Sequence, residues 1–216
     1  MKDKILVDIN KIVSKEITDK TIDLTIDYSE IGLDSFIEDG ILKEIPLVKS
    51  ILSFYNIANS VIDRHKTQKI LSFFKEFHSQ SINKEKLNNF KNKFNEDVNF
   101  QNRVVELIIL LNERFLHVEK SKILANLIIA HIEEHISWEK LLDITFVLDN
   151  IHPNGFDFLK KMSIQKYPWS SNEFRFIEEE SLMFACGIGL RQGNRFQITE
   201  MGKILYDYGI KPLRKI

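Results

Sequence analysis

A pair of histidines four residues apart is the sharpest chemical pattern in this sequence. The stretch reads His131-Ile132-Glu133-Glu134-His135, and on a helix this spacing puts both imidazoles on one face. Two such imidazoles can share one zinc ion, with a neighbouring glutamate as general base toward a zinc-bound water. The pattern makes a zinc hydrolase one candidate function, with His131 and His135 as metal ligands and Glu134 as the base.

An ordinary helix end explains the same residues without a metal. A catalytic zinc needs a third protein ligand, and the acidic run at residues 178–180 is what another segment offers for that role. Two histidines at this spacing also arise by chance on a charged helix. We therefore predict no bound metal, no cofactor and no catalytic residue, and we favour a non-enzymatic protein, with the zinc hydrolase as an alternative.

Four basic residues near the end of the chain are candidates for contacts with DNA phosphates: Arg175, Arg191, Arg195 and Lys203. Phosphate contacts dominate DNA affinity, so a recognition helix should be basic or neutral. The segment before the expected hairpin instead carries three glutamates at residues 178–180. We therefore favour a protein-binding role for this region and keep a DNA-binding regulator as an alternative.

Composition excludes a disordered chain and a strongly basic nucleic-acid binder. The 216 residues are 44% hydrophobic and 28% charged, with a formal net charge of −1, which is enough apolar material for a core. Residues 64–93 nevertheless carry a net charge of +6. Their phenylalanines could face nucleic acid or an anionic membrane, but we predict that they are core and that the lysines face solvent. These phenylalanines are Phe73, Phe74, Phe77 and Phe90, and the adjacent Phe94 belongs with them.

Cysteine content and hydropathy favour a cytoplasmic protein. Cys186 is the one cysteine, which excludes an intramolecular disulfide and fits a reducing compartment. Residues 1–20 lack the continuous apolar core of a signal peptide. The most apolar long stretch, residues 45–62, is interrupted by Pro46, Lys49 and several serines and asparagines. We predict a buried or oligomer-forming helix there and keep a membrane-acting effector as an alternative.

The elements that would position these residues are mainly helices, because apolar residues recur every three to four positions over most of the chain. Four prolines and eight glycines are few for this length, which also favours helices. A basic link, residues 64–66, is expected to interrupt the stretch from Pro46 to Phe77. The predicted helices span residues 2–17, 33–45, 46–77 with that link, 81–94, 98–116, 119–135, 138–150, 154–162 and 172–184.

Residues 21–28 depart from the helical period. Ile22, Leu24 and Ile26 alternate with polar residues, which predicts an extended strand. Since no partner strand lies nearby in the sequence, this strand would pair with the C-terminal hairpin or with another chain. We therefore expect that the protein can form a homo-oligomer.

The C-terminal segment predicts a β-hairpin followed by a helix. Two short strands, residues 188–190 and 195–198, flank a Gly193-Asn194 turn. A last helix is expected from Thr199 through Tyr208, with Gly209 at its C-cap. In its order of helices, hairpin and closing helix, and in its Thr-x-x-Gly run, this region resembles winged-helix proteins over about the last 30 residues. The resemblance implies a fold more than a function.

A second resemblance rests on three stretches in the first part of the chain. Residues 32–35 read Gly-Leu-Asp-Ser, residues 40–48 read Gly-Ile-Leu-Lys-Glu-Ile-Pro-Leu-Val, and residues 69–74 read Lys-Ile-Leu-Ser-Phe-Phe. Together they resemble a group of uncharacterised bacterial helical proteins. The resemblance implies a bacterial, helical protein with no assigned activity, and by analogy an accessory of a stress or anti-phage defence system.

We therefore predict a mainly α protein, a helical bundle with a small C-terminal winged-helix-like domain that contains a β-hairpin. Its parts are an acidic N-terminal arm over residues 1–39, with a net charge of −5, a helical bundle over 40–135 and the winged-helix-like domain over 136–216. The expected function is a non-enzymatic interaction or regulatory protein with a protein partner, and DNA and membrane remain alternative partners.

Overall fold

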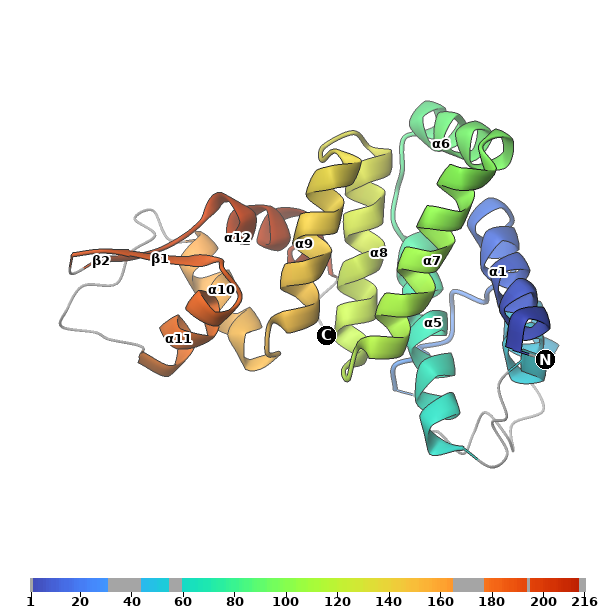
Figure 1. The fold of residues 1–216 in the computed structure, drawn as a ribbon, viewed down its shortest axis with the longest axis horizontal. Coiled ribbons are helices and arrows are strands. Elements are labelled where there is room, and N and C mark those ends of the chain that lie inside the picture. The colour runs from blue at the N-terminus through green and yellow to red at the C-terminus, as the bar shows by residue number, and fades with distance from the viewer. Residues whose placement is uncertain (1, 31–43, 55–59, 165–176, 194, 214–216) are drawn as a thin grey trace. The chain divides into compact units, whose positions relative to one another are not determined.

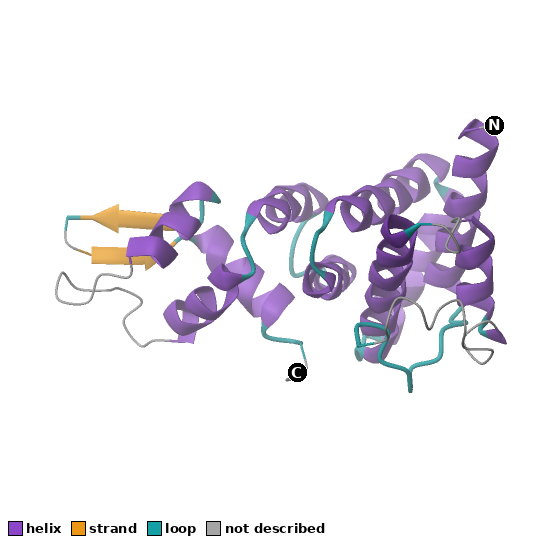
Figure 2. Ribbon diagram, turned by 90° about the horizontal axis from the view of Figure 1, so that it is seen from below, coloured by secondary structure: helices purple, strands orange, loops and turns teal. Residues whose placement is uncertain are grey.

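The structure, a computed structural model, describes residues 2–30, 44–54, 60–164, 177–193 and 195–213 (Figure 1). Most of these residues are helical, and the strands among them form one antiparallel hairpin, drawn in orange in Figure 2. This confirms the predicted class of a mainly helical protein with a small C-terminal hairpin. The elements are α1 (Lys2–Thr18), α4 (Pro46–Phe54), α5 (Val61–Ser79), α6 (Lys84–Glu96), α7 (Val98–Arg114), α8 (Val118–Ile132), α9 (Trp138–Asn150), α10 (Asn154–Ile164), α11 (Ile177–Ala185), β1 (Gly189–Gln192), β2 (Arg195–Ile198), α12 (Glu200–Ile204) and the π-helix η1 (Leu205–Ile210).

The chain divides into two compact units, Met1–Ala125 and Asn126–Ile216. The division falls inside α8, so it coincides with neither boundary of the sequence-based division, 39/40 or 135/136. Helix α1, which the sequence analysis assigned to an acidic arm, packs against α4 and α7 within the N-terminal unit. The two units are described separately below.

Helix α5 forms the centre of the N-terminal unit, since every residue from Thr67 to Phe74 is buried. Phe73 meets Phe74 edge to face at 5.1 Å between ring centroids, and a further aromatic cluster joins α6 to α7 through Phe90 and Phe100 at 5.7 Å. Full burial of each such side chain contributes roughly 1.5–3 kcal/mol. The prediction that the phenylalanines of residues 64–93 are core is therefore confirmed, and their rings are not available to stack on bases or enter a membrane.

Five of the described helices begin at a residue whose side chain caps the helix. Ser60, Asn83, Asp97, Ser137 and Thr199 each accept a hydrogen bond from a backbone N–H in the first turn of the helix that follows. Each such cap stabilises its helix by about 1 kcal/mol. The start of the helix predicted over residues 138–150 is confirmed by the Ser137 cap, and the start of the last helix is confirmed by the Thr199 cap.

The basic link predicted at residues 64–66 is wrong. These residues lie inside α5, which begins at Val61, and α4 ends at Phe54. The physical reason is the Ser60 cap, whose side chain accepts from the Asp63 N–H and fixes the start of the helix before the basic residues. No helix of the described residues is long and apolar enough to cross a membrane.

The strand predicted at residues 21–28 is also wrong, because the described chain makes turns there. Asp23 accepts from the Thr25 N–H at 2.8 Å and Asp27 accepts from the Ser29 N–H at 3.0 Å. These local bonds compete with strand pairing and overrule the period-two pattern. The loop gives no support to strand pairing between chains. The helix predicted over 33–45 lies mostly outside the described residues.

In the C-terminal unit, the hairpin packs against α10, α11 and α12. Gly193 adopts φ +56°, the left-handed conformation that a tight turn requires and that glycine tolerates. The predicted C-cap at Gly209 is wrong: this residue lies within η1, whose C-cap is Lys211. The helical backbone continues through Gly209, and the buried Asn126, distant in the sequence, donates a hydrogen bond to the Gly209 carbonyl at 3.0 Å.

Candidate functional site

The two histidines of the zinc pattern do not share a helix. Helix α8 ends at Ile132 and closes with the bond pattern of a Schellman motif, in which the His135 N–H donates to the Ala130 carbonyl at 2.9 Å and the Glu134 N–H to the His131 carbonyl at 3.0 Å. Glu134 takes the left-handed conformation of this motif, with φ +60°. His135 therefore follows a reversal of the chain instead of extending the helical face of His131.

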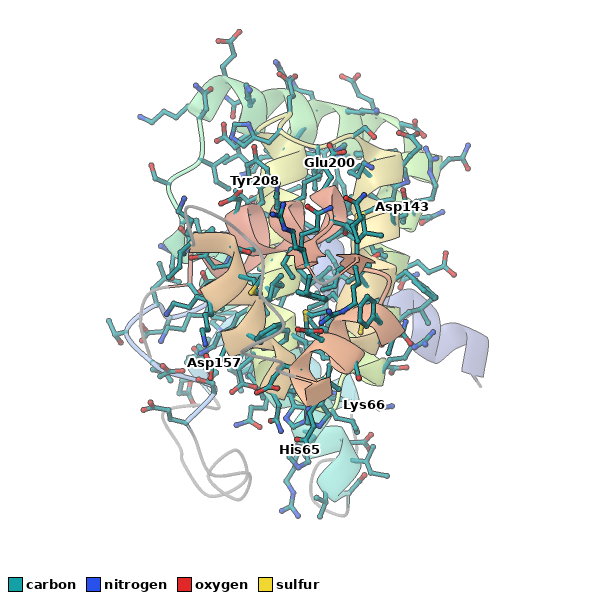
Figure 3. The ribbon with its side chains drawn as sticks, turned by 90° about the vertical axis from the view of Figure 1, so that its left-hand side faces the viewer. His65, Lys66, Asp143, Asp157, Glu200 and Tyr208 are labelled. Carbon is teal, nitrogen blue, oxygen red and sulfur yellow. The ribbon has the colours of Figure 1, made fainter. Side chains whose placement is uncertain are left out.

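Each histidine of the pattern has a separate structural contact. His131 donates from Nδ1 to the Ile136 carbonyl at 3.1 Å and meets Trp138 edge to face at 5.5 Å. His135 stacks on Tyr208 at 5.1 Å between ring centroids; Tyr208 is labelled in Figure 3. In the described part of the chain, no group of three or more histidine, cysteine, aspartate or glutamate side chains is placed to hold a metal ion. The geometry gives the zinc-hydrolase alternative no support.

The hairpin separates the two arginines that were predicted to contact DNA. Arg191 pairs with Phe196 across the strands, and Gln192 pairs with Arg195. Residues directly opposite each other lie on the same face of a hairpin and successive residues on opposite faces. Arg191 thus shares the inner face with the buried Phe196, whereas Arg195 lies on the outer face and is exposed.

Arg191 also has a protein partner, because its Nη2 makes an ion pair and hydrogen bond with Oε2 of Glu180. Glu180 is 3% exposed, so this pair fastens α11 to the hairpin away from solvent. Lys203 is exposed on α12, and Arg175 lies outside the described residues. The predicted DNA interface remains a prediction, with Arg195 and Lys203 as the described members that face solvent.

A buried glutamate that the sequence analysis missed organises the N-terminal unit. Glu16, 1% exposed, accepts hydrogen bonds at its carboxylate from the Thr21 N–H at 3.0 Å, the Ile22 N–H at 3.1 Å and the Thr21 hydroxyl. His78 Nε2 lies 3.2 Å from the same carboxylate. With four donors around it, the carboxylate is a structural anchor that joins the end of α1 to the next loop and to α5.

Two basic side chains, His78 and Lys91, cap the C-terminus of α1 from other helices. His78 Nε2 lies 2.9 Å from the Glu16 carbonyl, and Lys91 Nζ donates to the Thr18 carbonyl at 2.6 Å. Basic groups at a helix C-terminus satisfy its last carbonyls and stabilise its dipole. Both side chains also line a pocket of about 280 Å³, but their hydrogen bonds to α1 explain their positions without a ligand.

Lys69 is a buried lysine at the C-terminus of α7. It is 5% exposed, and its Nζ donates to the Phe115 carbonyl at 2.5 Å. Burial lowers the pKa of Lys69 to about 8, and the nearby positive charge of Lys66 acts in the same direction. A lysine with a lowered pKa can serve as a nucleophile, but this amine is enclosed and its carbonyl contact makes it a helix cap. The expectation that the lysines of this segment face solvent is wrong for Lys69.

Among the described residues of the C-terminal unit, Phe146 on the outer face of α9 is the most exposed large apolar side chain. Phe146 is 71% exposed and Leu142, one turn before it, is 41% exposed. The opposite face of the same helix is buried through Leu141, Ile144 and Leu148. The sequence indicates such a face, because α9 has more apolar residues than one buried face of a helix needs. The spacing of these residues alone does not identify which of them are exposed to solvent.

In comparisons with known proteins, no protein-family model, no curated protein and no solved structure matches this chain.

Proposed function

We propose that this chain is a non-enzymatic interaction protein, and that the outer face of α9 docks a protein partner. The observation that carries the proposal is the exposure of Phe146, because a phenylalanine 71% open to solvent on an otherwise well-packed helix forgoes most of its burial energy. Aromatic side chains are enriched at the centres of protein interfaces. Phe146 and Leu142, one turn apart, form the stripe that a partner would cover.

The charges beside this stripe define the chemistry of the partner. Glu139 and Asp143 are exposed on the same face of α9, and Asp143 is labelled in Figure 3. Complementary charge steers association and suppresses wrong partners. The occupant that fits is therefore a protein segment with apolar anchors and flanking lysines or arginines. A second copy of this chain fits less well, because two such faces would bring acidic residues together.

The architecture of the C-terminal unit supports the same role. Three helices, α9 to α11, precede the hairpin, and α12 closes the unit, which is the order of elements in a winged-helix module. The helix before the hairpin begins with three acidic residues, and Arg191 is held by Glu180. Both features favour protein contact over DNA contact. A cytoplasmic, regulatory role beside a bacterial stress or anti-phage system is part of the proposal and rests on the sequence resemblance.

Site-specific photo-crosslinking in the source cells tests the proposal. A photo-reactive phenylalanine analogue replaces Phe146 in the full chain, and the matched control carries it at Lys160, an exposed position on α10. We expect one protein adduct at position 146 and none at position 160. Mass spectrometry should map the adduct to a segment rich in lysine or arginine. An adduct pattern that is the same at both positions would refute docking on α9.

Binding of the purified partner then tests the charge argument. Asp143→Lys should weaken binding at least fivefold and reduce its salt dependence, since an acidic contact becomes repulsive. Asp157→Lys makes the same charge change on α10 and should leave affinity unchanged. Equal loss in both variants would show a non-specific charge effect and contradict the assigned surface. Light scattering on the purified chain tests whether a second copy of this chain occupies the same face. If the wild-type chain is a dimer and Phe146→Asp is a monomer, the face belongs to a second copy instead.

A further inference from the structure

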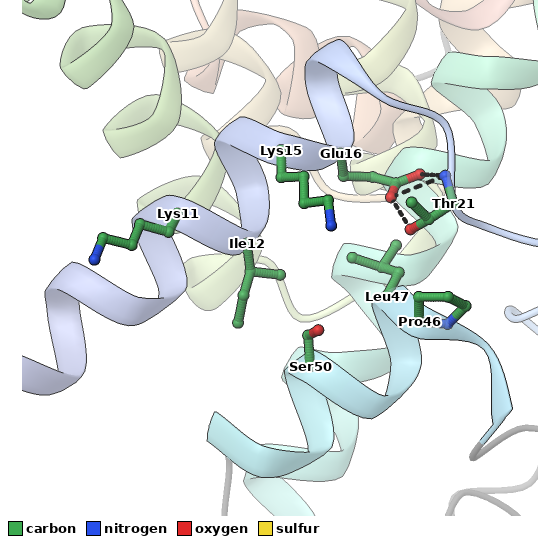
Figure 4. Close-up of a pocket in the computed structure, with 8 residues that line it drawn as sticks. All are labelled: Lys11, Ile12, Lys15, Glu16, Thr21, Pro46, Leu47 and Ser50. Carbon is green, nitrogen blue, oxygen red and sulfur yellow. Dashed lines mark hydrogen bonds between the residues drawn. The ribbon is translucent and has the colours of Figure 1, made fainter.

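A small pocket in the N-terminal unit combines an apolar floor with unpaired positive charge. It lies between α1 and α4, which pack against each other, and has a volume of about 170 Å³ (Figure 4). Its apolar surface comes from Ile12 on α1 and from Pro46 and Leu47 on α4. Leu47 is 2% exposed, so the floor belongs to the fixed core of the unit.

The acidic residue in the wall of this pocket does not oppose a negative ligand strongly. Glu16 lines the pocket, but its carboxylate is turned toward Thr21 and hydrogen bonded there (Figure 4). Its charge is further compensated by the Ile22 N–H and by His78. The electrostatic character of the opening is therefore decided by the lysines of α1.

Two of these lysines, Lys11 and Lys15, line the pocket one helical turn apart and are both exposed. Lys15 points toward Leu47, whereas the side chain of Lys11 extends away from Leu47 and from Lys15 (Figure 4). Among the side chains that the structure describes, neither ammonium group has a hydrogen-bond or ion-pair partner. Two like charges at this spacing repel each other, and a bound anion would relieve that repulsion.

We infer that this pocket binds a small amphiphilic anion, a carboxylate on a short aliphatic chain. The carboxylate contacts the ammonium group of Lys15, the charge of Lys11 adds to the positive potential of the opening, and the chain lies on Ile12 and Leu47. A volume below the roughly 300 Å³ of a typical drug-sized site limits the ligand to about eight non-hydrogen atoms, the size of hexanoate. For a ligand of this size and few polar contacts, a Kd on the order of 1 mM is expected.

Titration of the full-length, ¹⁵N-labelled chain with hexanoate at low salt, followed by NMR, tests the inference. Saturable shifts are expected at the amides of residues 11–16 and 46–50. Hexan-1-ol keeps the chain but removes the charge, and acetate keeps the charge but removes most of the chain. Both should bind at least fivefold more weakly than hexanoate. Inorganic phosphate is the third probe and should not produce the shifts at residues 46–50.

Matched lysine variants complete the test. Lys15→Met keeps an unbranched side chain without its charge and should weaken hexanoate binding at least fivefold. Lys20→Met makes the same change at an exposed lysine that does not line the pocket and should leave the affinity within twofold. The inference is overturned if hexan-1-ol binds as well as hexanoate, if phosphate matches hexanoate at the same residues, or if the two variants lose affinity equally. An unchanged spectrum at saturating hexanoate would overturn it as well.

Discussion

Substitution of Gly202 by alanine should destabilise the C-terminal unit, because this residue lies where α12 comes closest to the hairpin. A Cβ at Gly202 would be 2.3 Å from Cγ2 of Ile198 and 3.2 Å from Cβ of Ile188. Ile198 is 3% exposed and Ile188 is fully buried. Neither side chain can therefore move into solvent, and relief of the clash has to shift α12 or the strand.

Two opposing effects determine the size of the change in unfolding free energy. Overpacking of a well-packed core costs about 1–3 kcal/mol, whereas alanine is favoured over glycine inside a helix by about 0.5–1 kcal/mol. At 2.3 Å the clash involves a branched methyl group held by its neighbours, so we place the packing cost in the upper part of its range. The net result expected for Gly202→Ala is a loss of about 1–2 kcal/mol.

Hydrogen exchange of residues 188–205 in the full chain is the appropriate assay, because two units need not unfold together. Lys203→Ala, at the exposed neighbouring position, should change protection by no more than about 0.5 kcal/mol. In an Ile198→Ala background the offending Cγ2 is gone, so Gly202→Ala should cost at least about 1 kcal/mol less there. Protection equal to or above wild type, or the same cost in both backgrounds, would refute the packing argument.

Three further changes test the buried charges. Glu16→Gln places an amide NH2 group opposite the Thr21 N–H and hydroxyl donors, and should lower the free energy of unfolding by about 2–3 kcal/mol. Urea titration measures this change, and an unshifted midpoint would show that the Glu16 carboxylate is dispensable. The pKa of Lys69 is about 8 in the folded chain and 10.5 in the unfolded chain. Between pH 8 and pH 10.5 the unfolded state therefore binds more protons than the folded state. The free energy of unfolding should rise with pH over this range, by up to about 3 kcal/mol in total. Measured from pH 8 to 9.5, this rise should be smaller in Lys69→Met, and equal slopes would contradict the assignment. Arg191→Met leaves Glu180 without this partner and should cost about 2–3 kcal/mol, which Glu180→Gln in the same chain should partly restore; a double variant no more stable than the single one would contradict the pairing.

Elements governed by neighbours in the sequence could be predicted. The start of α9 at Ser137 and the start of α12 at Thr199 depend on one side chain and one backbone N–H three residues later. The hairpin depends on a glycine turn between two short strands. Helix α8 was predicted over residues 119–135, and from Lys120 to Ala130 all of its residues but Lys122 are buried, as its wide apolar surface requires.

Elements governed by competing or distant contacts were predicted wrongly. Residues 21–28 have the alternation of a strand, yet aspartate side chains form turns there. The last helix continues past Gly209, where Asn126, distant in sequence, bonds the backbone. In each case the hydropathy pattern of the segment is compatible with two backbone conformations. A hydrogen bond that the hydropathy pattern does not encode selects one of them.

The sequence by itself determined the helical class, the hairpin and the identity of the core aromatic residues, because periodicity and composition carry that information locally. Only the tertiary structure decided which polar groups are buried and which apolar ones are exposed. Glu16 acquires His78, 62 residues away, as a partner, and Lys69 reaches the carbonyl of Phe115. Phe146 stays in solvent on a helix whose opposite face is buried. Burial depends on what the rest of the chain places against a residue, and no pattern within one segment contains that information.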